Sequence, residues 1–141
     1  MKTSYSAGAA ALPASAAAGP LFLTILAAIT LYGRLPQPIV LSGGELAGFV
    51  VALPFAAIFG FPIAYLPNVA GTKLMAAISD NSAVAREPSV WMCAGGALIA
   101  VVIFGLDPQI EAPVGLSLIL TSAICARICR ACYAGPSPAQ V

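Results

Sequence analysis

The chain has 141 residues, of which 60% are hydrophobic and only 8% are charged, and its formal net charge is +1. Soluble domains carry about 25% charged residues, so this composition excludes a water-soluble globular protein. The lack of a basic run also argues against nucleic acid as a partner. The length leaves room for one domain with about four helices that cross a membrane, because each crossing needs roughly 20 apolar residues.

Long apolar runs separated by polar segments predict an all-α integral membrane protein with four transmembrane helices. We expect the spans at about 16–33, 45–67, 89–106 and 112–133, which together form one four-helix domain, residues 16–133. The head (1–15) and the tail (134–141) are rich in small residues and proline, so we expect both to be flexible. Segment 68–87 has two open interpretations: a short helix on the membrane surface, or a solvated connector.

The distribution of charge predicts the orientation of the bundle. With four spans, the head, segment 68–87 and the tail share one side of the membrane. That side holds most of the basic residues, namely Lys2, Lys73, Arg86, Arg127 and Arg130. Since basic residues accumulate on the cytoplasmic side of short loops, we expect both termini in the cytoplasm. Small alanine-rich chains with four spans are common in bacterial inner (plasma) membranes, and we expect this one there.

The second span carries the clearest helix-packing pattern. Small residues recur there at every fourth position: Gly48, Ala52, Ala56, Gly60 and Ala64. Positions four apart share one helix face, and small residues let membrane helices approach closely, so this pattern predicts a packing groove. The groove suits packing within the chain or contact with a second copy. Pro54 and Pro62 lie in the same span, and each is expected to kink it.

The cysteines raise the question of a metal site. Cys125, Cys129 and Cys132 share one side of the fourth span, and Cys93 is expected at a similar depth in the third. Four thiolates would suit zinc or another soft metal, so these four residues are candidate ligands. Redox chemistry and lipid acylation are further alternatives. Helix packing is the interpretation we favour, because free cysteine behaves as a small, readily buried residue.

The sequence shows no assembled catalytic machinery. It contains no histidine, and the four apolar runs carry no charged residue in their interiors apart from Arg127 near an end. We therefore expect that the protein is not an enzyme, binds no cofactor and has no catalytic residue. The expected function is that of a small structural or accessory subunit, or a homo-oligomer, whose partners are the lipid bilayer and other membrane chains. The alternative is a small carrier or channel for an uncharged or soft-metal solute, with cysteines at its cytoplasmic mouth.

Overall fold

The computed structural model describes residues 6–35, 42–82 and 84–133, and within them the secondary structure is helical, with no strand. The α-helices are α1 (Ala7–Tyr32), α2 (Gly43–Asn81), α3 (Pro88–Leu106) and α4 (Ala112–Cys132), and a 3-10 turn, η1 (Val84–Arg86), joins α2 to α3. By length and composition, four of the helices in these described segments are able to cross a membrane. The expected all-α architecture is thus present, while the expected flexible tail (134–141) lies outside the described residues.

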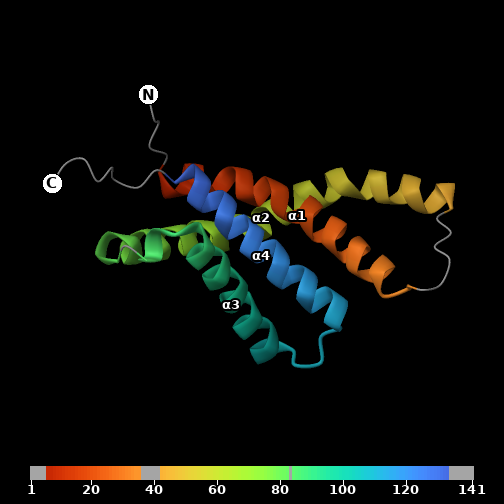
Figure 1. Cartoon of the computed structure of the whole chain (residues 1–141). Helices are drawn as coiled ribbons and strands as arrows, with labels where there is room; N and C mark the ends of the chain where they lie inside the picture. Colours follow the sequence, from red (N-terminus) through yellow and green to blue (C-terminus); the bar gives the residue numbers. More distant parts are fainter. Residues whose placement is uncertain (1–5, 36–41, 83, 134–141) are drawn as a thin grey trace.

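Helices α1 and α4 form the centre of the bundle. Helix α1 packs against α2 and against α4, and α3 packs along α4 (Figure 1). Consecutive helices run in opposite directions, so the start of α1 and the end of α4 lie at the same end of the bundle. At the α3–α4 contact, Gly95 lets the helices approach closely enough for the Ser122 hydroxyl to donate a hydrogen bond to its carbonyl oxygen, at 2.8 Å.

The first helix begins earlier than the sequence predicts. We expect a flexible head up to residue 15, but α1 starts at Ala7, where the Ser6 hydroxyl accepts a hydrogen bond from the Ala9 amide. Ala10, Ala11 and Ala14 are fully buried in this first part of the helix. Alanine is too weakly hydrophobic to signal a span by itself, but its small size allows close contact between helices, and this contact stabilises the segment.

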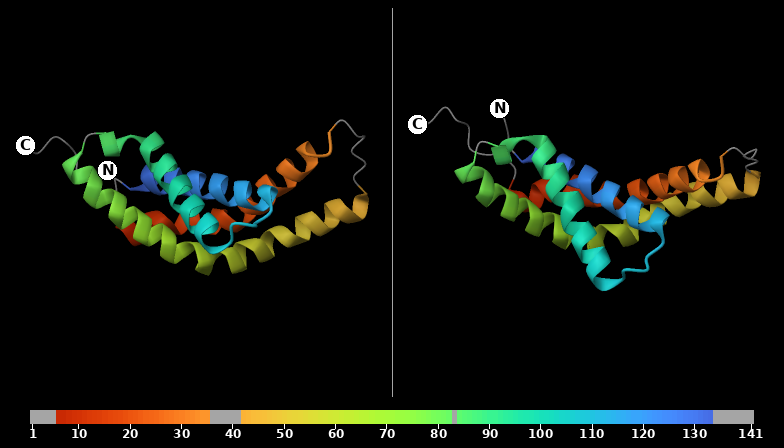
Figure 2. Two further views of the ribbon diagram at one scale, coloured as in Figure 1. Left: turned by 90° about the horizontal axis from the view of Figure 1, so that it is seen from below. Right: turned by 60° about the horizontal axis from the view of Figure 1, so that its bottom comes forward.

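The second helix also differs from its expected bounds of 45–67. It starts with a capping box between Ser42 and Glu45 and continues to Asn81, through much of the segment for which we expect a surface helix or connector. At about 1.5 Å per residue, its 39 residues follow a path of roughly 58 Å, about twice the apolar thickness of a bilayer. The helix bends along its length (Figure 2), and its three interior prolines explain the bend.

The distribution of side chains is that of a protein in an apolar solvent. The buried residues are mostly small, such as Ala11, Ala14 and Cys125, whereas large apolar side chains point outward. Ile63 is 76% exposed and Leu106 is 83% exposed. Helices in lipid gain little from burying large apolar groups and associate instead through small residues, so this arrangement fits a membrane-embedded bundle.

Candidate functional site

The packing groove of α2 is partly filled by α1. A Cβ atom added at Gly60 would lie 2.9 Å from the Cα atom of Gly19, and one added at Gly19 would overlap the backbone of Ala56. The two helices therefore touch backbone to backbone at this crossing. Ala64 packs against the buried core near Ala18, while a Cβ atom at Gly48 would meet nothing within 4 Å. Gly48, at the start of the groove, is thus not part of this contact.

Gly19 is the residue of α1 in this contact, and the sequence analysis did not predict its role. The signal was available, because Ala11, Ser15 and Gly19 are each four residues apart, as the small residues of α2 are. The pattern crosses residue 16, where the expected flexible head ends and the expected first span begins, so it was not followed. In the structure α1 continues through Pro13 and Pro20.

The four candidate cysteines do not form a metal site among the described residues. Cys125 and Cys129 are 2% exposed: the Cys125 thiol lies 3.4 Å from the carbonyl oxygen of Ala14, and Cys129 contacts Thr72. Cys93, in contrast, is exposed on α3. Within residues 6–35, 42–82 and 84–133, no group of three or more His, Cys, Asp or Glu side chains could hold a metal ion. The alternative of a four-thiol metal site is therefore not supported, and Cys125 and Cys129 are buried in the contacts between helices.

The basic end of α4 forms a polar cluster with the α2–α3 connection. Arg130 Nε donates a hydrogen bond to the carbonyl oxygen of Arg86, at 2.9 Å, and its guanidinium lies 6.0 Å from the Trp91 ring. The indole N–H of Trp91 donates to the carbonyl oxygen of Ala85, at 2.9 Å, which also accepts from the Ser79 hydroxyl. We call these residues the Trp91 cluster. It holds η1 against α3 and α4, which indicates a structural role for Arg130.

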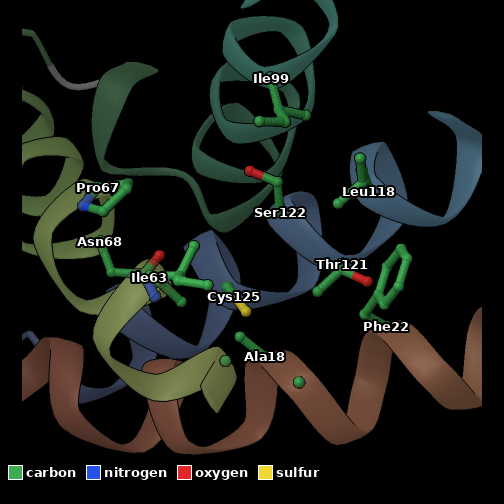
Figure 3. Close-up of a pocket in the computed structure, with 13 residues that line it drawn as sticks. Ala18, Phe22, Ile63, Pro67, Asn68, Ile99, Leu118, Thr121, Ser122 and Cys125 are labelled. Carbon is green, nitrogen blue, oxygen red and sulfur yellow. The ribbon is translucent and has the colours of Figure 1, made fainter. Parts of the chain in front are cut away.

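A cavity of about 360 Å³ lies between the four helices at their mid-height (Figure 3). Its wall includes Ala18 from α1, Ile63 from α2, Ile99 from α3 and Leu118 from α4. Each of these residues is near the middle of its helix. This size falls within the range of small-molecule sites, about 300–1,000 Å³. The cavity contains none of the cysteines considered as metal ligands except Cys125, and sequence reasoning did not find it.

No protein-family model, curated protein or solved structure matches this chain.

The cavity wall is apolar apart from a few uncharged polar groups. Three of them have partners in the protein: Asn68 donates to the Ser15 hydroxyl at 3.1 Å, Ser122 to the Gly95 carbonyl, and Cys125 to the Ala14 carbonyl. The fourth, Thr121, does not. Its side-chain oxygen is buried and has no hydrogen-bond partner among the described residues. A wall of this composition suits an uncharged molecule better than an ion.

Proposed function

We propose that this protein is a small, non-enzymatic subunit of a membrane assembly, formed with further copies of itself or with other membrane chains. The observation that supports this role is the arm formed by the end of α1 and the start of α2. In both views of Figure 2 this arm extends past α3 and α4. Large apolar side chains near the start of α2, including Leu46, Val50 and Val51, are exposed.

The open end of the α2 groove lies on this arm. Gly48 is exposed, and a Cβ atom there would have open space around it. A small-residue face favours a neighbouring helix over lipid, because only a helix gains from the close backbone approach. The adjoining Ala56–Gly60 part already shows this use, since it holds Gly19 of α1. We infer that the 48–52 end accepts a helix from another chain.

An orientation with both termini in the cytoplasm belongs to the same proposal, as does a location in a bacterial inner membrane. The end of the bundle where α1 begins carries most of the described basic residues, namely Lys73, Arg86, Arg127 and Arg130. The opposite end has Arg34 together with three acids, Glu45, Asp107 and Glu111. Excess Lys and Arg favours the cytoplasmic side. A reporter fused after residue 133 tests this: fluorescence of a fused GFP is expected, and activity of a fused alkaline phosphatase would contradict it.

A non-enzymatic role is supported by the chemistry of the chain. It has no histidine, and the cavity wall carries no charged side chain. General acid–base catalysis in a membrane interior needs such groups held in place. The proposed role needs none of them, because helix packing depends only on shape and on small residues.

The apparent mass of the native protein in a mild detergent tests whether it assembles. Two matched leucine variants are compared with the wild type. Gly48 and Gly105 are both exposed glycines whose added Cβ would meet nothing within 4 Å, so neither Gly48→Leu nor Gly105→Leu should disturb the fold. Only Gly48 lies in the groove. We expect the wild type and Gly105→Leu to migrate as a larger assembly and Gly48→Leu to shift toward the monomer. A monomeric wild type, or equal behaviour of both variants, would contradict the proposal.

A second candidate function, a carrier or channel for an uncharged solute, is favoured by the mid-height cavity. Pro67 is in its wall and, with Pro62, lies on the bent helix α2, which could serve as the moving element. The expected result is that proteoliposomes equilibrate glycerol faster than protein-free vesicles. Equal rates of light-scattering change after osmotic shock would reject this function for glycerol-sized solutes.

A further inference from the structure

Three arginines meet at the basic end of the bundle, where α2 is joined to α3. Arg130 Nε donates to the Arg86 carbonyl oxygen at 2.9 Å, and its guanidinium lies 6.0 Å from the Trp91 ring. Arg127, one turn earlier on α4, places Nη1 at 3.9 Å from the sulfur of Met92. Both arginines of α4 therefore contact the α2–α3 connection or the start of α3. We call Arg86, Arg127 and Arg130 the arginine cluster.

The arginine cluster makes no ion pair with a carboxylate among the described side chains. Arg86 Nε donates to the Ser79 carbonyl oxygen at 3.0 Å, and both described hydrogen bonds of Arg130 also end on carbonyl oxygens. A guanidinium has five N–H donors, so most donors of the cluster have no acceptor in the described part of the protein. Arg86 and Arg127 are exposed, which leaves their donors open to an acceptor from outside the chain.

The charge at this end of the bundle is positive even when its acidic residues are counted. The described helices and η1, with the residue that follows it, carry four basic and two acidic residues here, namely Lys73, Arg86, Arg127, Arg130, Asp80 and Glu87. Glu87 is exposed, and its side chain makes no hydrogen bond to the start of α3. Like charges that are gathered without a counter-ion repel one another. An anion bound at the arginine cluster would relieve this repulsion.

The arginine cluster lies where two of the candidate membrane spans end. Helix α3 begins at Pro88 and α4 ends at Cys132, both at the same end of the bundle (Figure 1). The rings of Trp91 and Tyr133 lie 6.2 Å apart there, and such aromatic residues are enriched at the boundary between lipid and water. Arg127 is only about 7.5 Å from the end of α4, a distance that its long side chain can span. The guanidinium groups can therefore reach the level of the lipid phosphates.

The chemistry of the cluster favours the phosphate of an anionic lipid. Guanidinium groups bind phosphate through pairs of parallel hydrogen bonds. An anionic phospholipid brings such a phosphate to the membrane boundary, and its acyl chains can lie against exposed apolar side chains of α3, such as Leu98 and Val101. A zwitterionic lipid carries a cation beside its phosphate, so a positively charged cluster attracts it less. Free phosphate has the same polar group but gains nothing from the apolar surface.

We propose that the arginine cluster is a binding site for the phosphate of an anionic phospholipid, with Arg86 and Arg127 as its exposed donors. The site is separate from the surface proposed for assembly, because Gly48 and the arm lie at the other end of the bundle. Loss of lipid binding and loss of assembly can therefore be observed independently of each other.

Native mass spectrometry of the full chain in dodecyl maltoside tests the site. Phosphatidylglycerol and phosphatidylcholine with identical acyl chains are supplied in equal amounts, and we expect the protein to retain phosphatidylglycerol in preference. Equal retention of the two lipids would overturn the proposal. Inorganic phosphate should displace phosphatidylglycerol only weakly, because it lacks acyl chains. Complete displacement at a concentration equal to that of the lipid would identify free phosphate as the ligand and overturn the assignment to a lipid.

Two substitutions that each remove one positive charge provide the matched comparison. Arg127→Gln removes an exposed donor of the cluster and breaks only the contact with the Met92 sulfur, whereas Lys73→Gln removes an exposed charge outside the cluster. The ratio of bound phosphatidylglycerol to phosphatidylcholine should fall about ten-fold in Arg127→Gln, the factor for one hydrogen bond to a charged group, and should change little in Lys73→Gln. Arg86→Gln should repeat the fall, with folding of each variant checked by Trp91 fluorescence. An equal fall in Lys73→Gln, or an unchanged ratio in both cluster variants, would refute the site.

Discussion

Replacing Gly19 by alanine should separate α1 from α2. The new Cβ atom would lie 2.5 Å from the carbonyl carbon of Ala56 and 3.2 Å from the amide nitrogen of Ala57. Non-bonded carbons prefer about 3.5–4.0 Å, so the helices must move apart by at least about 1 Å at this crossing. The atoms that block the methyl group are backbone atoms, so a change of side-chain rotamer cannot relieve the overlap. Overpacking of this kind costs about 1–3 kcal/mol.

Gly48→Ala is the matched control for this prediction. Both glycines lie inside helices, so both variants gain up to about 1 kcal/mol of helix propensity, and this gain cancels in the comparison. Only Gly19 contacts a backbone from another helix. We therefore expect Gly19→Ala to be less stable than Gly48→Ala by about 2 kcal/mol in free energy of unfolding.

Unfolding by SDS in mixed micelles measures this difference. Trp91 is the single tryptophan of the chain and is 2% exposed, so its fluorescence should report the loss of the core. Gly19→Ala should unfold at a lower SDS fraction than either the wild type or Gly48→Ala. If the two variants unfold at the same SDS fraction, the backbone contact between α1 and α2 does not stabilise the protein as inferred here.

Three further predictions concern the basic end of the bundle. In detergent, N-ethylmaleimide should modify the exposed Cys93 well before the buried Cys125 and Cys129, as mass spectrometry of peptides can show. Arg130→Lys keeps the charge but loses the fork-shaped donor that binds the Arg86 carbonyl, so cleavage by a protease around η1 should become several-fold faster. The double variant with Cys93→Ser and Cys129→Ser should purify with the same metal content as the wild type, because neither thiol belongs to a group of three or more possible ligands among the described residues.

For each of these predictions, the opposite outcome would contradict the reasoning. Equal modification rates for the thiols would mean that the α1–α4 contact opens readily in detergent. Unchanged cleavage in the Arg130 variant, with Lys73→Arg as a control for charge-conserving change, would remove the structural role of the Trp91 cluster. A metal content that falls in the double cysteine variant would restore the soft-metal interpretation.

The sequence alone predicted that the protein is embedded in lipid, how many helices cross the membrane, and roughly where those helices lie. These features depend on composition and on long apolar runs, which are properties of the chain summed over many residues. All four expected spans come within two residues of a helix bound at one or both ends. The clearest example is the fourth span, expected at 112–133 and found at Ala112–Cys132.

Only the tertiary structure decided which residues meet. The early start of α1 depends on its alanines packing against α4, and the role of Gly19 depends on the backbone of α2 that lies opposite. The mid-height cavity likewise has no signal in the sequence. It exists because residues from four helices, far apart along the chain, line one space. The sequence pattern shows which residues lie on each helix face. Which faces come into contact depends instead on how closely the helix backbones can approach one another.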